Sequence, residues 1–538
     1  MFIILKQNRK RAGASQWHGR LARASSMKSL AALCILVILF SGFSSHASAQ
    51  CLANEIQKLT ASDPSLGDHF GTSVIILGDM AIVGANRANV EQYLGGAAYV
   101  FRKEPITNQW IQEQKVFAAD PGPQDEFALS VAINPIDPNL IIIGAWADDD
   151  ADDCGNDSAC ESGSAYIFRF DPDLGLWIQE QKLTASDAEP QDRFGWAVSI
   201  WGDVAIIGAR FDDDPSQNSG TAYVFRYDEN TGTWNEQQKI LSPDPGTFGT
   251  SISLEGDVVL IGASADQEFG IGSGAAYIFR MDPDTQIWQL EQKLLPDDPV
   301  QGAGFGRSVS LDGNTALIAA PGADGVWFLE GAAYAFTYNG RQWTQQQKLF
   351  ASDGEPLDLF GRAVSLAGNT AVIAAIFDEV NEQTVGSTYI FTFDSQQWNE
   401  TAKLYASQFD GAEAFGTHAA TDGENVIVGA NFAVIDGNNE AGAAFIFGGL
   451  GDCNNNGIID ICDIADGNAA DKNSNGLPDE CDDLPCPWDL DNSGSVGVGD
   501  LLMMFAQWGT PGIADFNGDG IVNTSDLLIL LANWGPCP

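Results

Sequence analysis

The chain has 538 residues, too many for one ordinary hydrophobic core and enough for a large repeat array with small additional modules. Lys and Arg together number 26 against 73 Asp and Glu, which gives a formal net charge of −47. This charge argues against nucleic acid and anionic membrane surfaces as partners, because both attract basic residues. It favours a soluble protein in a salty or calcium-containing medium.

Residues 1–49 are predicted to be an export signal. They contain seven basic residues and no acid, then the apolar run Leu30–Phe40, then "ASA" at Ala47–Ala49. The run is too short to span a bilayer, although an N-terminal membrane anchor is the alternative. Translation starting at Met27 is a second hypothesis, and Gln50 before Cys51 fits a lipid anchor poorly. We therefore expect a secreted or cell-surface protein with no transmembrane segment in the mature chain.

Eight cysteines follow the signal, an even number that predicts disulfides in an exported chain. Cys154 and Cys160 flank one short loop and are expected to pair. The other candidates, for which the connectivity stays open, are Cys51, Cys453, Cys462, Cys481, Cys486 and Cys537.

Residues 52–448 contain seven internal repeats, each opened by a Phe that lies 54 to 67 residues after the previous one. The seven are Phe70, Phe127, Phe194, Phe248, Phe305, Phe360 and Phe415. Each repeat begins with an alternating run such as "FGWAVSIWGD" (residues 194–203), followed by "VAIIGA" (204–209) and a variable polar loop. It continues with a run such as "GTAYVFRY" (220–227), a second turn, and a Trp-containing segment such as "TWNEQQKIL" (233–241).

These runs predict four strands per repeat, because they are short, rich in β-branched and aromatic residues and bounded by Gly, Asp and Asn turns. Seven four-stranded units indicate a mainly β protein, a seven-bladed β-propeller, in preference to a linear β-solenoid. Gly-Ala pairs such as Gly208-Ala209 should let neighbouring sheets approach closely. The Trp of each fourth strand is expected to pack between blades, with a stacking platform for sugar as the alternative.

The pattern "FG…GA…GAAYVF" resembles the FG-GAP repeat of integrin alpha-subunit propellers and their bacterial relatives. That resemblance implies a display or interaction protein. Integrin-type blades can carry a D-x-D-x-D-G calcium loop, but here the turns after the first strand are too short for one. Acids gather instead between the second and third strands, at Asp148–Asp150, Asp152 and Asp153 and at Asp212–Asp214. We interpret them as a solvated acidic rim, with calcium or ligand binding there as the alternative.

The segment 449–484 contains two copies of an acidic loop, "DCNNNGIIDICD" (452–463) and "DKNSNGLPDECD" (471–482). Alternating oxygen-bearing residues with Gly at position 6 and Asp at position 12 predict calcium ligands, and an acidic linker without metal is the alternative. The copies resemble thrombospondin type 3-like calcium repeats. The candidate ligands are Asp452, Asn454, Asn456, Asp460, Asp463, Asp471, Asn473, Asn475, Asp479 and Asp482.

Residues 485–538 contain two further loops, "DLDNSGSVGVGD" (489–500) and "DFNGDGIVNTSD" (515–526), each running into an apolar helix. Together they resemble a type I dockerin, a small α-helical domain with paired calcium-binding F-hands, whose partner is a cohesin-like protein. The candidate ligands are Asp489, Asp491, Ser493, Ser495, Asp500, Asp515, Asn517, Asp519, Ile521, Asn523 and Asp526. We interpret the helix leucines Leu501, Leu502, Leu527, Leu528 and Leu531 as the core of this domain, with one helix face left exposed for a receptor.

The sequence favours a non-catalytic protein for binding, adhesion or architecture, with calcium as its only expected cofactor. Its partner would be a cohesin-like or other extracellular protein, or a surface glycan, and not nucleic acid. His69 and His418 are the only histidines after the signal, and no nucleophile motif accompanies them. A polysaccharide-binding or polysaccharide-degrading component of an extracellular complex is the alternative, and a pair of catalytic carboxylates could not be located from sequence.

The first repeat-like phrase, "EIQKLTASD" (55–63), stands alone before the first Phe, whereas the seventh repeat ends at Phe447 without a fourth strand. We predict that residues 55–59 pair with residues 443–447 and close the ring, which removes two exposed sheet edges. This pairing would also bring Cys51 near Cys453.

Overall fold

The structure is a computed structural model of the whole chain. It describes residues 51–53, 55–90, 94–105, 107–149, 161–323, 329–380, 383–407, 413–450, 459–465, 468–469, 488, 490, 495–510, 512–514, 516, 521–532 and 535–536. The predicted export signal and the pair Cys154 and Cys160 lie outside these residues.

Seven β-sheets of consecutive strands form the seven-bladed β-propeller expected from the repeats, and that prediction is confirmed. Blade one comprises β3 (Phe70–Leu77), β4 (Met80–Ala85), β5 (Ala97–Lys103) and β6 (Trp110–Val116). Blade two comprises β7 (Phe127–Ile133), β8 (Leu140–Ala145), β9 (Ser164–Asp171) and β10 (Leu176–Leu183). Blade three comprises β11 (Phe194–Trp201), β12 (Val204–Ala209), β13 (Thr221–Asp228) and β14 (Thr233–Leu241). Blades four and five comprise β15 (Phe248–Glu255), β16 (Val258–Ala263), β17 (Ala275–Met281) and β18 (Trp288–Leu294); and β19 (Val309–Asp312), β20 (Thr315–Ala320), β21 (Ala332–Tyr338) and β22 (Trp343–Leu349). Blades six and seven comprise β23 (Phe360–Ala367), β24 (Thr370–Ala375), β27 (Ser387–Phe393) and β28 (Trp398–Leu404); and β29 (Phe415–Thr421), β30 (Val426–Ala430) and β31 (Ala443–Phe447).

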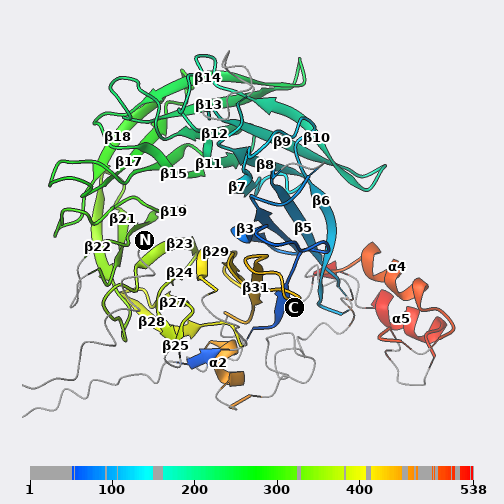
Figure 1. Cartoon of the computed structure of the whole chain (residues 1–538). Coiled ribbons are helices and arrows are strands. Elements are labelled where there is room, and N and C mark those ends of the chain that lie inside the picture. The colour runs from blue at the N-terminus through cyan, green and yellow to red at the C-terminus, as the bar shows by residue number, and fades with distance from the viewer. Residues whose placement is uncertain are drawn as a thin grey trace, which may run out of the picture. The chain divides into compact units, whose positions relative to one another are not determined.

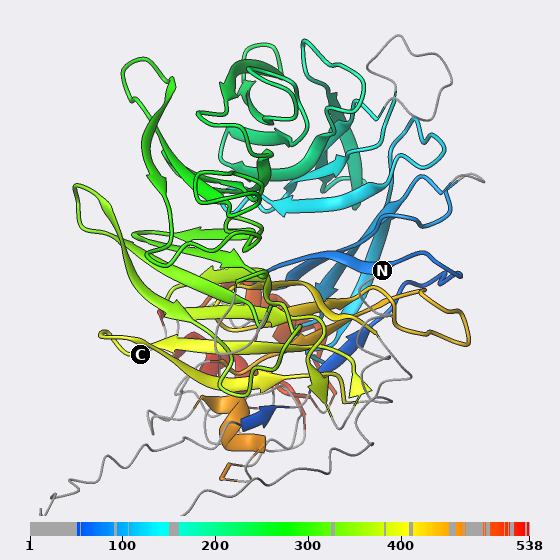
Figure 2. The same cartoon turned by 60° about the vertical axis from the view of Figure 1, so that its left-hand side comes forward.

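The first strand of every blade lies nearest a common axis, and the strands then follow outward in chain order (Figure 1). The first strands contact one another in sequence, from β3 through β29 and back to β3. Figure 2 shows the same sheets from a second direction, following one another from cyan through green to yellow. Because consecutive strands are antiparallel, the loop between the second and third strands lies at the same end of each blade as the opening Phe. We call this end the loop face.

The burial pattern of the strands follows from their depth in the blade. In most second strands, such as β12, every residue is buried because neighbouring blades cover both faces of the sheet. The outer strand β14 alternates more, with Trp234 and Ile240 buried and Asn235 exposed. Tight turns such as Gly202, with φ of +59°, connect the first and second strands.

Glycines permit the close approach of blades that the sequence predicted. A Cβ on Gly208 would lie 2.2 Å from the carbonyl oxygen of Gly249 in the next blade. A Cβ on Gly195, where φ is +87°, would lie 2.1 Å from the carbonyl oxygen of Ser164. Side chains at these positions would push the inner strands apart.

The hydrophobic core is divided into clusters that lie between blades. Each cluster in the propeller combines side chains from two consecutive blades, such as Phe194 and Tyr223 of blade three with Ile142 of blade two. One cluster joins blade seven to blade one through Ile446 and Phe70. The predicted packing of the fourth-strand Trp residues is confirmed, because Trp110, Trp177, Trp234, Trp288, Trp343 and Trp398 are all buried. Each blade is therefore stabilised mainly by its neighbours.

Two short strands precede the first blade. Strand β2 (Gln57–Leu59) pairs antiparallel with β31, with Gln57 opposite Ile446 and Leu59 opposite Ala444. Strand β1 (Cys51–Ala53) pairs in parallel with β28 and makes blade six five-stranded. Blade six also carries a small hairpin of β25 (Glu379–Val380) and β26 (Gln383–Thr384).

After the propeller, the described residues contain three helices. Helix α2 (Asp460–Ala465) follows blade seven, and its Ile461 and Cys462 join the cluster between blades six and seven. Helices α4 (Val498–Ala506) and α5 (Thr524–Ala532) contact each other, and β32 (Ser495–Val496) pairs with β33 (Gly535–Pro536). Val496, Met504, Val522 and Leu530 form a small core for this part of the chain.

Candidate ligand-binding face and its supporting contacts

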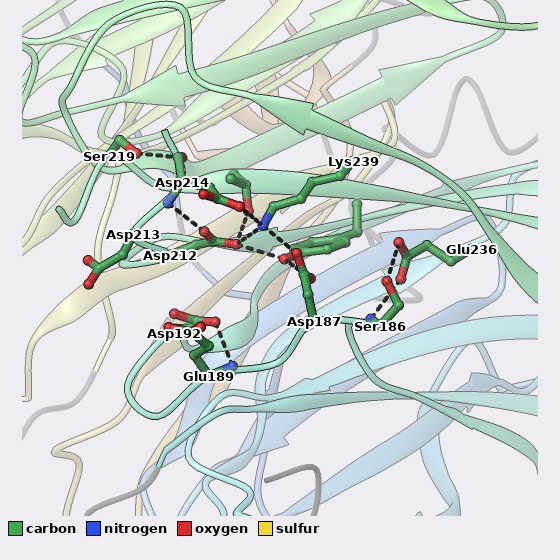
Figure 3. A network of polar contacts seen from close by, with 12 residues as sticks. Ser186, Asp187, Glu189, Asp192, Asp212, Asp213, Asp214, Ser219, Glu236 and Lys239 are labelled. Atoms are coloured by element: carbon green, nitrogen blue, oxygen red, sulfur yellow. Dashed lines mark hydrogen bonds and ion pairs between the residues drawn. The ribbon is translucent and has the colours of Figure 1, made fainter. Parts of the chain in front are cut away.

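A lysine on the outer strand of blade three gathers three carboxylates near the loop face (Figure 3). The Nζ atom of Lys239 lies 2.7 Å from an oxygen of Asp187, 3.0 Å from Asp212 and 2.9 Å from Asp214. The hydroxyl of Tyr223 lies 2.8 Å from Asp187 and 2.7 Å from Asp212. We call this arrangement of Lys, Tyr and Asp residues a lysine node.

The charges of the node stabilise one another. Burial lowers the pKa of Lys239, but its hydrogen bonds to the three carboxylates outweigh this and hold the pKa above its ordinary value. Burial by itself would raise the pKa of Asp187, but the hydrogen bonds from Lys239 and Tyr223 lower this pKa below its usual range. The ammonium group thus occupies the space between carboxylates where a cation would otherwise be held.

The node recurs around the ring, with fewer acids in some blades. Lys182 pairs with Asp120 and Asp148, Lys293 with Asp244, Asp266 and Glu268, and Lys403 with Asp353 and Asp378. Lys115 pairs with Asp63 and Lys348 with Asp298, in blades where Ala88 and Ala323 replace the buried loop Asp. In blade seven Phe445 replaces the Tyr, and Lys58 lies over its ring at 5.3 Å.

The expectation of a solvated acidic rim is wrong for Asp148 and Asp212, because both are buried and paired with a lysine of their own blade. Asp213 and Asp214 are exposed, as expected. Asp150, Asp152 and Asp153 lie outside the described residues. Among the residues that the structure describes, no group of three or more His, Cys, Asp or Glu is arranged to hold a metal ion.

A second buried carboxylate precedes the inner strand in several blades. Burial, with the nearby charge of Asp212, raises the pKa of Asp192 to about 7, although the backbone N–H of Glu189 donates to it and lowers the pKa in part. Asp125 holds the same position in blade two, and burial raises its pKa to about 7 as well. These groups hold the loop that connects one blade to the next.

Outer strands are joined by an amide clip. The side chain of Gln181 accepts the backbone N–H of Trp234 at 2.8 Å and donates to its carbonyl oxygen at 2.8 Å. The clip recurs in Gln57–Trp110, Gln114–Trp177, Gln238–Trp288, Gln292–Trp343 and Gln347–Trp398. A bulge one residue before the Gln turns Glu180 toward the indole N–H of Trp234, at 3.0 Å.

These contacts fix a rigid frame, whereas the loops between second and third strands differ from blade to blade. Apolar side chains are exposed on the loop face at Leu66, Leu94, Phe269 and Ile271, the last with 71% of its surface accessible. His69 also lies at this end, with its ring edge-on to Phe432 and its Nε2 atom 3.4 Å from Glu440. His418 is on β29, near the axis. Sequence reasoning did not single out Arg210, Arg307 or Arg362, and the only signal for them is the Arg that follows "FG" in two repeats.

In the C-terminal part, the structure describes the last carboxylate of three predicted calcium loops (Asp463, Asp500 and Asp526) and Asp460 at position 9 of the first. Asp460, Asp463, Asp500 and Asp526 are all buried, with at most 1% of their surface accessible. One oxygen of Asp500 accepts the N–H of Gly497 at 2.6 Å, and one of Asp526 accepts the N–H of Asn523 at 2.9 Å. The carbonyl oxygen of Ile521 accepts the side-chain amide of Asn523.

The remaining predicted ligands lie outside the described residues, apart from Ser495, for which the structure describes only the main chain. They are Asp452, Asn454, Asn456, Asp471, Asn473, Asn475, Asp479, Asp482, Asp489, Asp491, Ser493, Asp515, Asn517 and Asp519. The side chains of all the disulfide candidates except Cys462 also lie outside them, so the calcium sites and the disulfides stay predictions.

The assignment of the helix leucines to a core holds for two of them. Leu501 and Leu527 pack against the small core. Leu502, Leu528 and Leu531 are exposed, because Leu502 and Leu528 lie opposite Met504 and Leu530 on their helices and Leu531 lies one turn from Leu528. They form an apolar helix face with Val498 and Phe505, which are also exposed.

The described residues include no helix of the length and hydropathy needed to cross a membrane. The fold and its recurring contacts define a seven-bladed propeller of repeated four-strand units. The FG-GAP repeat family matches the chain at residues 53–101, 110–168, 177–225, 234–279, 288–336, 343–391 and 398–447. The chain therefore belongs to the FG-GAP repeat family. Each matched unit begins at an outer strand and ends with the third strand of the next blade, and the first begins with residue 53.

No curated protein matches the chain. Among solved structures, a chain of the "Crystal Structure of Mitotic Checkpoint Complex" is 10% identical and aligns with a TM-score of 0.45, covering 81% of this chain and 98% of that one. A similarity at this score supports no inference about function.

Proposed function

We propose that the protein is an exported, non-catalytic binding or adhesion-type protein. Its propeller presents a ligand-binding surface on the loop face, and its C-terminal part attaches it, in the presence of calcium, to a cohesin-like protein or a cell surface. The observation that carries the proposal is the division of the propeller into a frame and loops. Polar contacts recur in almost every blade of the frame, whereas the loops vary and expose apolar groups.

The exposed side chains on the loop face suit contact with another macromolecule. Phe269 and Ile271 lie in one loop of blade four with 47% and 71% of their surfaces accessible. Large apolar side chains are costly to leave in water and mark interaction sites when they gather on one face. A protein or a glycan with an apolar face could cover them.

Calcium is the cation that the C-terminal loops fit best. Asp463, Asp500 and Asp526 close three of the acidic loops, and Asp460 is at position 9 of the first; all four are buried, and buried carboxylates favour a bound cation. When bound, Ca²⁺ would link the oxygens at positions 1, 3, 5 and 12 of each loop. In each F-hand the Asp that would hold it, Asp500 or Asp526, begins a helix and so connects the loop to the exposed apolar face.

That face supplies a surface for docking. Val498, Leu502 and Phe505 recur at helical spacing on α4, and Leu528 and Leu531 do so on α5. A pair of helices with apolar side chains on two sides, one packed in the core and one facing outward, is suited to a partner with an apolar groove.

The test compares the full chain with two variants in capture from an extracellular fraction, with calcium or with a chelator. Phe269→Ser/Ile271→Ser is expected to abolish the capture of ligands that bind the propeller. Leu502→Asp/Leu528→Asp should abolish the calcium-dependent capture of the partner of the C-terminal part. Ile136→Ser, an exposed residue in a turn at the opposite end of blade two, is the matched control. Capture that survives both double variants would contradict the proposal. Binding to polysaccharide alone would favour the lectin-like alternative.

Calcium and export have separate tests. Calorimetric titration of the full chain should show Ca²⁺ uptake that falls in Asp500→Asn/Asp526→Asn, and no uptake by the wild-type chain would remove the metal from the proposal. N-terminal sequencing of protein recovered from the medium should begin near residue 50 if residues 1–49 are cleaved.

A further inference from the structure

Three arginines of the propeller lack a carboxylate partner although the protein is strongly acidic. Among the described residues, Arg210, Arg307 and Arg362 form no ion pair. The other described arginines of the propeller are paired except for Arg341 in an exposed turn; the paired ones are Arg87, Arg102, Arg169, Arg193, Arg226 and Arg280. With 73 acidic residues in the chain, an arginine without a partner is not explained by a shortage of acids.

The three arginines belong to one region near the axis, at the loop face. Arg307 and Arg362 follow the "FG" that opens blades five and six, and Trp196 holds this position in blade three. In blade six the ladder between the first two strands is interrupted at this point, between Phe360 and Val364. Such an irregularity re-aims side chains away from the sheet. Both arginines are only partly exposed.

The fold brings these cations into one region. Arg307 and Arg362 stand at the start of neighbouring blades whose first strands, β19 and β23, contact each other, and Arg210 lies over Trp196, which holds the same position in blade three. Burial and the charge of Arg307 lower the pKa of Arg362 to about 9. Burial, with the charges of Arg307 and Arg193, likewise lowers the pKa of Arg210 to about 9. Burial, with the charges of Arg362 and Arg307, lowers the pKa of His418 to about 4, although a hydrogen bond with the backbone of Val74 raises it in part. No carboxylate offsets these effects. Guanidinium groups repel one another here, and a bound anion would relieve that repulsion.

Aromatic side chains hold Arg210 in place. Its guanidinium carbon lies 4.1 Å from the ring centroid of Trp196 and 4.5 Å from that of Phe211. Trp196 packs edge-on against Trp146, over which Arg193 lies at 4.3 Å. These contacts use the faces of the guanidinium group and leave its N–H edge for a ligand. The Nε atom of Arg210 and the Nδ1 atom of His418 are buried without a hydrogen-bond partner.

We propose that Arg210, Arg307, Arg362 and His418 form a binding site for an oxyanion at the loop-face end of the propeller axis. A carboxylate, sulfate or phosphate group matches the planar fork of a guanidinium, which binds two of its oxygens at once. At neutral pH the uncharged His418 lines the site, its ring hydrogen-bonded to the backbone of Val74, and the three guanidinium groups supply the donors. The site shares no residue with the exposed side chains of the loops or with the C-terminal helices. Whether this site binds an anion is therefore independent of the proposed adhesion function.

Anion titration of the full chain tests the proposal. Calorimetry with sodium sulfate, phosphate or acetate at constant ionic strength is expected to show binding of at least one anion to the wild-type chain. Arg307→Gln/Arg362→Gln should weaken that binding by at least about tenfold, because each charge-assisted hydrogen bond removed is worth about that factor. Arg341→Gln, in an exposed turn, is the matched control and should bind as wild type.

Competition among the three anions identifies the chemistry, since acetate reports a planar carboxylate and sulfate or phosphate a tetrahedral group. Binding that is unchanged in the double variant overturns the proposal, as does the absence of binding by the wild-type chain at millimolar anion. A second measurement needs no variant. A crystal of the wild-type chain soaked in selenate should show an anomalous peak within hydrogen-bond distance of Arg307 and Arg362. Selenate found only elsewhere overturns the assignment.

Discussion

At the scale of single residues, the lysine of a blade's outer strand stabilises the buried acid of that blade's loop. Asp212 is almost fully buried, and an isolated buried carboxylate would be strongly destabilising. Lys239 and Tyr223 satisfy it, and the same solution recurs with Lys182 and Lys293. The node therefore serves the frame of the propeller.

The lysine node predicts an asymmetry between two lysines at the same strand position. Lys239→Met should lower the free energy of unfolding by about 2 kcal/mol, because Asp212 loses its counter-charge while Asp187 and Asp214 are partly exposed. Lys58→Met should change it by less than about 0.5 kcal/mol, since Phe445 and Ala433 stand where other blades have Tyr and Asp. Denaturant unfolding measures both. Equal effects at the two sites would show that the carboxylates do not depend on the lysine.

Asp192 predicts a pH dependence with a definite sign. Burial raises its pKa to about 7 in the folded chain, whereas the unfolded value is 3.8. The folded state therefore binds the proton more tightly, and stability falls as the pH rises between these values, by up to about 1.4 kcal/mol per pH unit. Asp192→Asn can still accept the N–H of Glu189, so we expect it to stabilise the chain at pH 8 and to have little effect at pH 4.

Thermal unfolding at the two pH values measures this difference. Asp173→Asn, at an exposed turn residue, is the control and should shift neither melting temperature. An Asp192→Asn variant that melts below wild type at pH 8 would show that the charged form is the stable one.

At the scale of strands, neighbouring blades are joined by backbone groups at the inner end and by side-chain amides at the outer end. The second strand of one blade approaches the first strand of the next so closely that a Cβ on Gly208 would lie 2.2 Å from the carbonyl oxygen of Gly249. Serines of one inner strand accept N–H groups of the next, as Ser253 does from Leu311 at 3.0 Å. At the outer end the Gln clip satisfies the backbone of each Trp. Both devices require one residue type at one position, which explains why the repeats are so uniform.

Substitution at the inner end should separate steric from conformational effects. Gly208→Ala should destabilise the chain by about 2–3 kcal/mol, since the new methyl group would overlap a backbone oxygen that cannot move alone. Gly202→Ala has open space around it but a φ of +59°, so about 1 kcal/mol is expected. If Gly208→Ala costs no more than Gly202→Ala in denaturant unfolding, the blades are less closely packed than described.

Substitution at the outer end tests the amide clip. Gln181→Leu leaves the N–H and C=O of Trp234 without partners and should destabilise the chain by about 2 kcal/mol. Gln289→Leu, at an exposed position of the same kind of strand, should be nearly neutral. Hydrogen exchange of the Trp234 amide gives a direct readout, and protection that persists in Gln181→Leu would contradict the clip.

Much of the strand arrangement could be predicted because its signals are local. Alternation, tight turns and the repeated Phe define four strands per blade within a few residues of one another. Long-range contacts could not be read in this way. Asp212 is buried and paired with Lys239, which lies 27 residues further along the chain, and no residue near "FDDD" indicates this partner. The sequence signal for the pairing of β1 with β28 is Ala402, which replaces the Gln that forms the amide clip in the other outer strands.

The C-terminal helices show the same limit. A run such as "LLILLA" predicts a helix, but every side of it is apolar, so the pattern does not tell which side packs inward. The structure assigns Leu527 and Leu530 to the core and leaves Leu528 and Leu531 outside. The arginines near the axis come from blades three, five and six, and only the closed ring brings them together.

At the scale of the whole molecule, a ring of blades is stable only where every interface is complete. Each core cluster of the propeller lies between two blades, including the one that joins blade seven to blade one. Leu59 of β2 is buried in that cluster, and Gln57 clips the first outer Trp, Trp110. Asp63 continues the connection by pairing with Lys115. The N-terminal segment thus contacts both the last blade and the first.

Deleting residues 52–62 should therefore cost more than about 4 kcal/mol, since the loss of one buried Leu alone costs 2–5 kcal/mol and the edge of β31 would also be exposed. A disordered terminus of this length would cost almost nothing. Thermal unfolding and size-exclusion chromatography of the truncated chain measure the loss and any aggregation through the open edge. A synthetic peptide of residues 52–63 added in trans should restore the melting temperature, whereas a scrambled peptide should not. A truncated chain that melts with the full-length protein would show that the ring does not depend on this strand.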